Sequence, residues 1–184
     1  NDYLFWGTNN FYEDPLDQSS EKRNAKILDL ESNSVVSYGR RKDMEPYETL
    51  SLWQILSDLE NQSLFIYDPG NVFNPADNIY EFDSSTNYFA SVFSTNLTIR
   101  DPAVHGDEIV FSAIGSNDKI AIYYALKGGS EQLVAETTVS FYESIEQLPL
   151  IWSGNVIYPA KNADNEIVLH IWNSNTKSDQ ELAI

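Results

Sequence analysis

The strongest constraint on the fold is a set of three short, β-rich apolar runs that recurs four times along the 184-residue chain. In the last two copies the first runs carry Phe111 and Tyr158 and the second runs open at Ile120 and Ile167, so both spacings are 47 residues. The earlier copies are spaced by 60 and 46 residues for the first runs and by 52 and 41 for the second. Periods of about 40 to 50 residues are typical of β-propeller blades. We therefore predict an all-β fold, a β-propeller-like array of about four blade units.

We expect a single propeller domain, or a fragment of a larger propeller, over residues 1–184. Its units are expected at about 1–45, 46–95, 96–146 and 147–184. A further strand is expected before the first run of a blade, at 97–99 and at 148–152. The continuous apolar run over 166–172 indicates a strand covered on both faces. Counted in this way, the chain begins at the second strand of a blade. Blades outside this sequence are the favoured explanation, with a partner or a blade closed by both termini as alternatives.

The segment 46–60 breaks the pattern of strands. Its apolar residues follow helical spacing at Leu52, Ile55, Leu56 and Leu59, and Pro46 suits the first turn of a helix. We predict one short helix there, with a distorted outer strand as the alternative.

Composition excludes several classes of function. The chain has 28 Asp and Glu against 11 Lys and Arg, a net charge of −17, which disfavours a nucleic-acid partner. No apolar run approaches the roughly 20 residues of a membrane span. The absence of cysteine removes disulfides, thiolate metal sites and thiol nucleophiles. An acidic, Asn-rich chain of this kind leads us to expect a bacterial exported protein, extracellular or periplasmic.

Catalytic motifs are absent from the sequence. There is no His-x-x-x-His pair, no Gly-x-Ser-x-Gly elbow and no Gly-rich phosphate loop, so we predict no catalytic residue, metal or cofactor. His170 is expected to be a satisfied strand residue, and His105 is expected to be solvated in a turn. Acids at strand ends could serve as a glycosidase pair, although 28 acids place some there by chance. These acids are Asp29, Glu81, Asp107 and Glu166.

Two polar segments have plain interpretations. The loop 68–78 is rich in oxygen ligands but lacks the order of a calcium loop, so we predict a simple connection. Its ligand-type residues are Asp68, Asn71, Asn74, Asp77 and Asn78. The basic cluster 40–42 is expected to offset neighbouring acids.

Aromatic residues beside polar loops are the candidate binding residues. Trp6, Phe11, Tyr12 and Phe73 flank or occupy such loops. Exposed aromatic side chains stack on sugars or anchor protein partners. We predict that these four contribute to a binding surface, with a place in the hydrophobic core as the favoured alternative for Trp6.

The last two units resemble blades of the TolB-like and WD40-like propeller family. The family pattern of a turn glycine, a strand, a polar loop, a second strand and a Gly-rich hairpin is similar to Gly106–Ser112, Ser116–Ile120 and Lys127–Gly129. A second copy runs over Trp152–Tyr158 and Asn162–Ile167. The S-P-D-G turn of the family is replaced by His105-Gly106 and Ser153-Gly154. The resemblance implies a scaffold whose surfaces bind proteins or ligands.

We therefore predict a non-enzymatic propeller scaffold that binds a protein partner or ligand. One alternative is a propeller hydrolase, either a glycosidase with carboxylates in a channel or the propeller part of a peptidase. Another is a sugar-binding lectin, which predicts an equivalent aromatic pocket in each unit.

Overall fold

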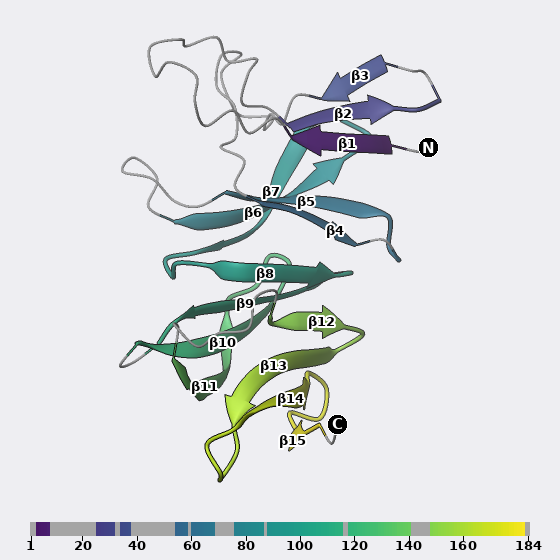
Figure 1. Cartoon of the computed structure of the whole chain (residues 1–184). Helices are drawn as coiled ribbons and strands as arrows, with labels where there is room; N and C mark the ends of the chain where they lie inside the picture. The colour runs from purple at the N-terminus through teal and green to yellow at the C-terminus, as the bar shows by residue number, and fades with distance from the viewer. Residues whose placement is uncertain are drawn as a thin grey trace.

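The computed structural model describes residues 3–7, 25–31, 34–37, 54–58, 60–68, 76–86, 88–115, 118–140 and 148–182. These residues form strands and turns, and the described ranges contain no α-helix. The strands make four antiparallel sheets (Figure 1) in which neighbours along the chain are also neighbours in the sheet.

The sheets follow the order of the chain. The first sheet holds β1 (Tyr3–Gly7), β2 (Ala25–Asp29) and β3 (Ser34–Ser37). The second holds β4 (Gln54–Asp58), β5 (Ser63–Asp68), β6 (Asp77–Asp83) and β7 (Tyr88–Thr95). The third holds β8 (Arg100–His105), β9 (Glu108–Ile114), β10 (Lys119–Leu126) and β11 (Gln132–Ser140). The fourth holds β12 (Leu150–Trp152), β13 (Asn155–Lys161), β14 (Ile167–Asn173) and β15 (Asp179–Glu181).

The helix predicted over 46–60 is wrong in its described part. Residues 54–58 form β4, which pairs with β5 so that Leu56 lies opposite Phe65. Leu56 and Asp58 are buried while Ser57 is exposed, the two-residue alternation of a strand. Pairing with β5 therefore outweighs the helical spacing of the apolar residues. Two of those residues, Leu52 and Leu59, lie outside the described residues. The alternative prediction, a distorted outer strand, is closer to the structure, although β4 is the first strand of its sheet.

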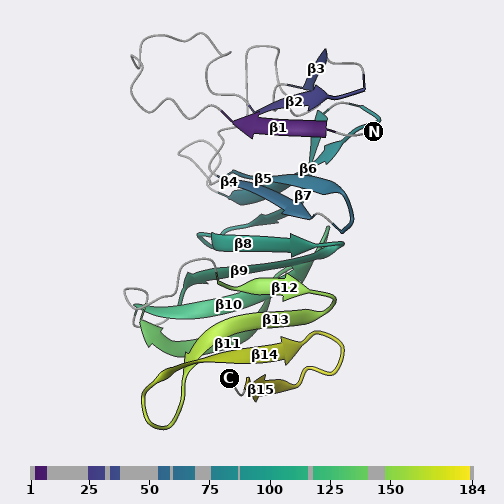
Figure 2. The same ribbon diagram turned by 45° about the vertical axis from the view of Figure 1, so that its right-hand side comes forward.

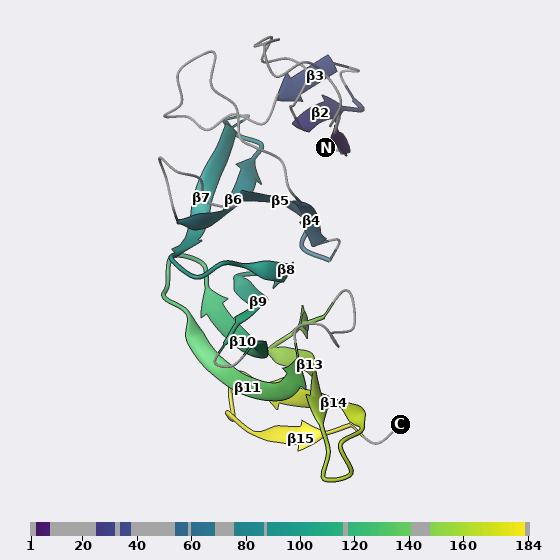
Figure 3. The ribbon, with the colours of Figure 1, turned by 60° about the vertical axis from the view of Figure 1, so that its left-hand side comes forward.

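The sheets are stacked one after another along the chain (Figures 1 and 2), on a curved path. Figure 3 shows β4 and β8 on the concave side of this arc and β7 and β11 on the convex side. The first strands are neighbours, since β4 contacts β8 and β8 contacts β12. The described sheets form an open, propeller-like array and not a closed ring. The all-β prediction and the strand at 148–152 are confirmed, whereas the strand expected at 97–99 begins at Arg100.

Two hydrophobic clusters hold the last three sheets together. Ile109 and Phe111 of β9 belong to the cluster that includes Phe65 and Ile79 of the second sheet. The alternate residue Val110 belongs to the cluster shared with the fourth sheet. The third sheet is therefore buried on both faces, which explains its continuous apolar runs. The prediction that the strand over 166–172 is covered on both faces is wrong, because Ile167 of β14 is 39% exposed.

Removing a side chain from between two sheets is expected to destabilise the array. Ile122 is fully buried between the third and fourth sheets, so Ile122→Ala should lower the free energy of unfolding by about 2–5 kcal/mol. Leu133→Ala is the control, because Leu133 is half exposed on β11 and should lose less than about 1 kcal/mol. Urea unfolding followed by circular dichroism measures both. Equal losses would contradict the assignment of Ile122 to an inter-sheet core.

Candidate functional site

The turns that join the first and second strands of three sheets meet at one edge of the array. In the third sheet the turn follows His105, and Gly106 has φ +57°. In the fourth sheet Ser153 and Gly154 both have positive φ, 48° and 76°, as a two-residue hairpin turn requires. Glycine therefore appears at both turns for a conformational reason. These turns leave backbone N–H groups pointing toward the preceding sheet.

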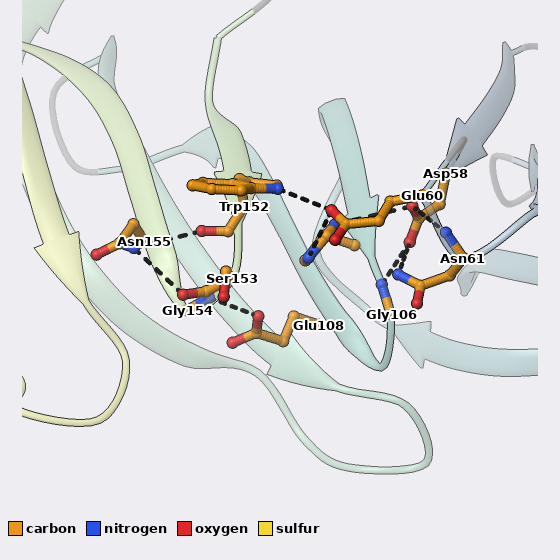
Figure 4. A network of polar contacts seen from close by, with 10 residues as sticks. Asp58, Glu60, Asn61, Gly106, Glu108, Trp152, Ser153, Gly154 and Asn155 are labelled. Atoms are coloured by element: carbon orange, nitrogen blue, oxygen red, sulfur yellow. Dashed lines mark hydrogen bonds and ion pairs between the residues drawn. The ribbon is translucent and has the colours of Figure 1, made fainter.

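Asp58, at the end of β4, accepts one of these N–H groups. Its buried carboxylate accepts a hydrogen bond from Gly106 N of the next sheet, and from Asn61 N at 3.2 Å and Asn61 Nδ2 at 2.8 Å (Figure 4). Burial alone would raise the pKa of Asp58. The hydrogen bonds from Gly106 and Asn61 outweigh it, so the pKa of Asp58 lies below its ordinary value.

Glu108, at the start of β9, makes the corresponding bond one sheet further on. Its carboxylate accepts hydrogen bonds from Gly154 N at 2.7 Å and Ser174 Oγ at 3.1 Å, both in the fourth sheet. Tyr124 Oη donates to the same carboxylate at 2.9 Å. Burial, and then the bond to Glu108, raise the pKa of Tyr124. Successive sheets are thus joined by a carboxylate on one turn and a glycine N–H on the next.

Three residues from three sheets gather on this framework, and we call them the inner-edge site: Glu60, His105 and Trp152. Trp152 Nε1 donates a hydrogen bond to Glu60 Oε2 at 2.9 Å, although the residues are 92 positions apart. His105 lies between them, with Nε2 at 3.9 Å from Glu60 Oε2 and its ring centroid 6.4 Å from that of Trp152. Figure 4 shows Trp152 and Glu60 turned toward one another across the turn of the third sheet.

Exposure separates the supporting residues from those that meet solvent. Asp58 is buried and the side chain of His105 is 15% exposed, with Nδ1 at 3.7 Å from Asp58 Oδ1. Glu60 is exposed and Trp152 is 63% exposed. The site therefore presents an indole ring and a carboxylate on a buried polar support. The prediction of a solvated His105 is wrong, because β8 carries it between the neighbouring turns.

The predicted binding residues are not brought together by the described structure. Trp6 lies in β1, and Phe11, Tyr12 and Phe73 lie outside the described residues. Sequence reasoning placed Trp152 in the strand expected before the first run of the last unit, but did not single it out as a candidate site residue. The available signal was an aromatic residue directly before a Ser-Gly turn at the end of that strand.

Three of the four candidate acids have structural partners. Glu81 and Asp107 both lie near Lys127 Nζ, at 2.9 Å and 3.6 Å. Glu166 accepts a hydrogen bond from Asn162 in the hairpin at the other end of β14. Asp29 is the last residue of β2. As predicted, His170 is a paired strand residue, with Nδ1 at 2.9 Å from Asp179 Oδ2.

The described part of the 68–78 loop is also structural. Asp77 is buried and accepts hydrogen bonds from Tyr67 Oη and Ile99 N, each at 2.7 Å. Asn71, Asn74 and the basic cluster 40–42 lie outside the described residues. Among the residues described, no group of three His, Asp or Glu side chains is placed to hold a metal ion. Over the same residues, no helix is long and apolar enough to cross a bilayer.

Comparison with solved structures finds chains of similar fold. No family model and no curated protein matches the sequence. The fold is similar to TolB from Acinetobacter baumannii at a TM-score of 0.48 and 14% identity, over 87% of this chain and 37% of that one. The chain thus spans little more than a third of the length of that protein. The antiparallel sheets, each with its strands in chain order, are what makes the fold propeller-like.

Loss of the Asp58 carboxylate is expected to weaken the bond between the second and third sheets. Asp58→Asn places an amide donor beside the Asn61 amide, so we expect a loss of about 1–3 kcal/mol of stability at pH 7. The folded pKa of Asp58 lies below its unfolded value of about 3.9, so its contribution is complete above that pH. It is lost as the pH falls through the folded pKa. The difference between wild type and variant should therefore narrow below about pH 4.

Urea unfolding between pH 7 and pH 3 measures this difference. Glu60→Gln is the control, because Glu60 is exposed and should change stability little at any pH. A difference for Asp58→Asn that stays constant down to pH 3 would contradict the ionised-acceptor role.

Gly154 is expected to tolerate alanine less well than Gly128. Both have positive φ, at +76° and +70°, so alanine costs about 1 kcal/mol of backbone strain at either position. A Cβ at Gly154 would lie 2.9 Å from Ser174 Oγ, whereas a Cβ at Gly128 meets nothing within 4 Å. Gly154→Ala should lose at least about 1 kcal/mol more, because Ser174 must leave Glu108. Thermal unfolding of the two variants tests the order, and equal losses would contradict it.

Proposed function

We propose that this protein is a non-enzymatic, propeller-like scaffold that binds a protein partner at the inner-edge site. The observation that carries the proposal is Trp152, which is 63% exposed while its indole Nε1 is held by Glu60. Tryptophan is the residue type most enriched at binding hot spots. A ring already held in one orientation loses little conformational entropy when a partner covers it.

The charge around Trp152 favours a cationic segment of the partner. Glu60 offers an exposed carboxylate beside the indole ring. An Arg or Lys of the partner can lie on the ring and pair with Glu60 at once. The net charge of −17 draws a basic partner to the surface and repels an acidic one. An apolar side chain next to that cation would pack on the remaining surface of the ring.

The hydrolase alternatives have less support in this geometry. A general acid needs a raised pKa, whereas the pKa of Asp58 is lowered by the N–H groups that it accepts. Glu108 is likewise an acceptor for three donors. A peptidase would need its nucleophile on another domain.

The lectin alternative predicts an aromatic residue at equivalent positions of each unit. The last residues of β4, β8 and β12 are Asp58, His105 and Trp152. Only one of these is an indole or phenyl ring, so the site is built once from three sheets. This favours recognition of one partner surface. We also propose an exported location, extracellular or periplasmic, on the acidic, Cys-free composition.

Selection from a random-peptide phage library on the immobilised protein tests the proposal. We expect the enriched peptides to carry Arg or Lys beside an aromatic or aliphatic residue. A synthetic peptide of the enriched sequence should bind Trp152→Ala at least about 30-fold more weakly, which corresponds to a hot spot of about 2 kcal/mol. Glu60→Gln should weaken binding by a smaller factor and reduce its dependence on salt.

Leu133→Ala is the matched control, since Leu133 is exposed on β11, away from the first strands. Circular dichroism confirms that each variant is folded. Peptides that bind wild type and Trp152→Ala equally, or a selection that enriches no basic sequence, would overturn the proposed site.

A further inference from the structure

The inner-edge site contains one imidazole, that of His105. An imidazole ordinarily changes its charge between about pH 5 and pH 8, whereas carboxylates ordinarily titrate near pH 4. The side chain of His105 is 15% exposed, so its neighbours cover most of it and solvent still reaches it. It can therefore take up a proton from solvent in a pH range in which carboxylates are ordinarily ionised.

Each ring nitrogen of His105 faces a carboxylate. Nδ1 lies 3.7 Å from Asp58 Oδ1, and Nε2 lies 3.9 Å from Glu60 Oε2. A neutral imidazole has one N–H group and one lone pair, so it can act as a donor toward only one of these carboxylates. A protonated ring carries a donor on both nitrogens. Only the protonated ring therefore fits both carboxylates at once.

Asp58 holds its charge whether or not His105 carries a proton. Burial would raise the pKa of Asp58, but the hydrogen bonds from Gly106 and Asn61 outweigh it, so this pKa lies below its ordinary value. The bond from Gly106 N that joins the second and third sheets is therefore kept at mildly acidic pH. A proton on His105 acts on the site without undoing its support.

Other titratable groups around His105, among the described residues, have partners of their own. Glu108 lies opposite His105 in the β8–β9 hairpin, and its carboxylate accepts the three hydrogen bonds described above. Asp107, in the turn between them, is 83% exposed and lies 3.6 Å from Lys127 Nζ. On the side of the fourth sheet, β12 has no titratable residue. Glu60 is thus the carboxylate that both His105 and a partner can reach.

A proton on His105 and a cation of a partner would compete for this carboxylate. Glu60 Oε2 already accepts the indole hydrogen bond of Trp152 (Figure 4) and faces His105 Nε2. A cation that pairs with Glu60 comes within about 4 Å of the carboxylate, and His105 Nε2 is equally near. Physiological salt screens charges only beyond a Debye length of about 8 Å. The two positive charges would therefore repel one another.

We propose that His105 makes partner binding at the inner-edge site depend on pH. While the ring is neutral, Glu60 pairs with the cation of the partner, and that cation lies on Trp152. When the ring is protonated, His105 pairs with Glu60 and the cation is displaced. Affinity is therefore highest above the titration of the imidazole and is lost as the pH falls through it. The inference rests on the proposed function, because it concerns the same cation-binding site.

Nuclear magnetic resonance of the isotope-labelled protein, with acetyl-Arg-Leu-amide as the probe, tests this proposal. The probe carries one guanidinium and one aliphatic side chain, and nothing on it titrates between pH 5 and pH 8. Its dissociation constant is measured from the shift of the Trp152 indole N–H resonance, which Trp152→Phe identifies by its loss. We expect this constant to be at least about threefold larger at pH 5.5 than at pH 8.

His105→Gln replaces the imidazole by a side chain that is uncharged at either pH. It should bring the ratio of the two dissociation constants close to one. This ratio is the readout, because it does not depend on any change in affinity that the glutamine itself causes at both pH values.

His170→Gln is the matched control, because His170 is the other of the two histidines and pairs with Asp179 in the fourth sheet. It should keep the wild-type ratio, and circular dichroism at both pH values shows whether each variant is folded. A wild-type ratio near one, or a ratio that is unchanged in His105→Gln, would refute the pH dependence and leave the cation-binding site in place. A probe that shifts the Trp152 resonance at neither pH would refute the proposed cationic partner and this inference with it.

Discussion

The third sheet has to bury apolar side chains on both of its faces, and the rest of the arrangement depends on this requirement. Ile109 and Phe111 face the second sheet while Val110 faces the fourth, so neither neighbour can be removed without exposing a core. Sheets that pack face to face in chain order bring their first strands together, as β4, β8 and β12 show. Because those strands share the concave side, the turns that follow them also meet. The inner-edge site forms where these turns come together.

Apolar packing fixes the distance between sheets but is not directional, and the polar bonds supply the alignment. Asp58 and Glu108 each accept a glycine N–H from the next turn. Lys127 also makes polar contacts between sheets. Its Nζ lies 2.9 Å from Glu81 of the preceding sheet and over the ring of Phe65. Lys177 similarly reaches Gln132 of the preceding sheet. Part of the acidic composition thus has a structural use, because some carboxylates act as acceptors between sheets.

Local pattern was sufficient to predict what is local in the fold. The 47-residue spacing of Phe111 and Tyr158 matches an identical register in two hairpins, and the turns at Gly106 and Gly154 lie where glycine predicted them. The sequence misled over 54–58, where pairing with β5 decides the conformation. It also gave no sign that Glu60 and Trp152 meet, because a contact across 92 residues leaves no periodic signal. Of the four aromatic residues predicted beside polar loops, three lie outside the described residues, and the exposed Trp152 lies at a strand end.

The inner-edge site depends on the array as a whole. It takes one residue from each of three sheets and exists only while those sheets keep their alignment. A change in the contacts between sheets would therefore disturb the site. A partner that needs the assembled site would bind only the aligned array and would thereby stabilise the alignment of the sheets.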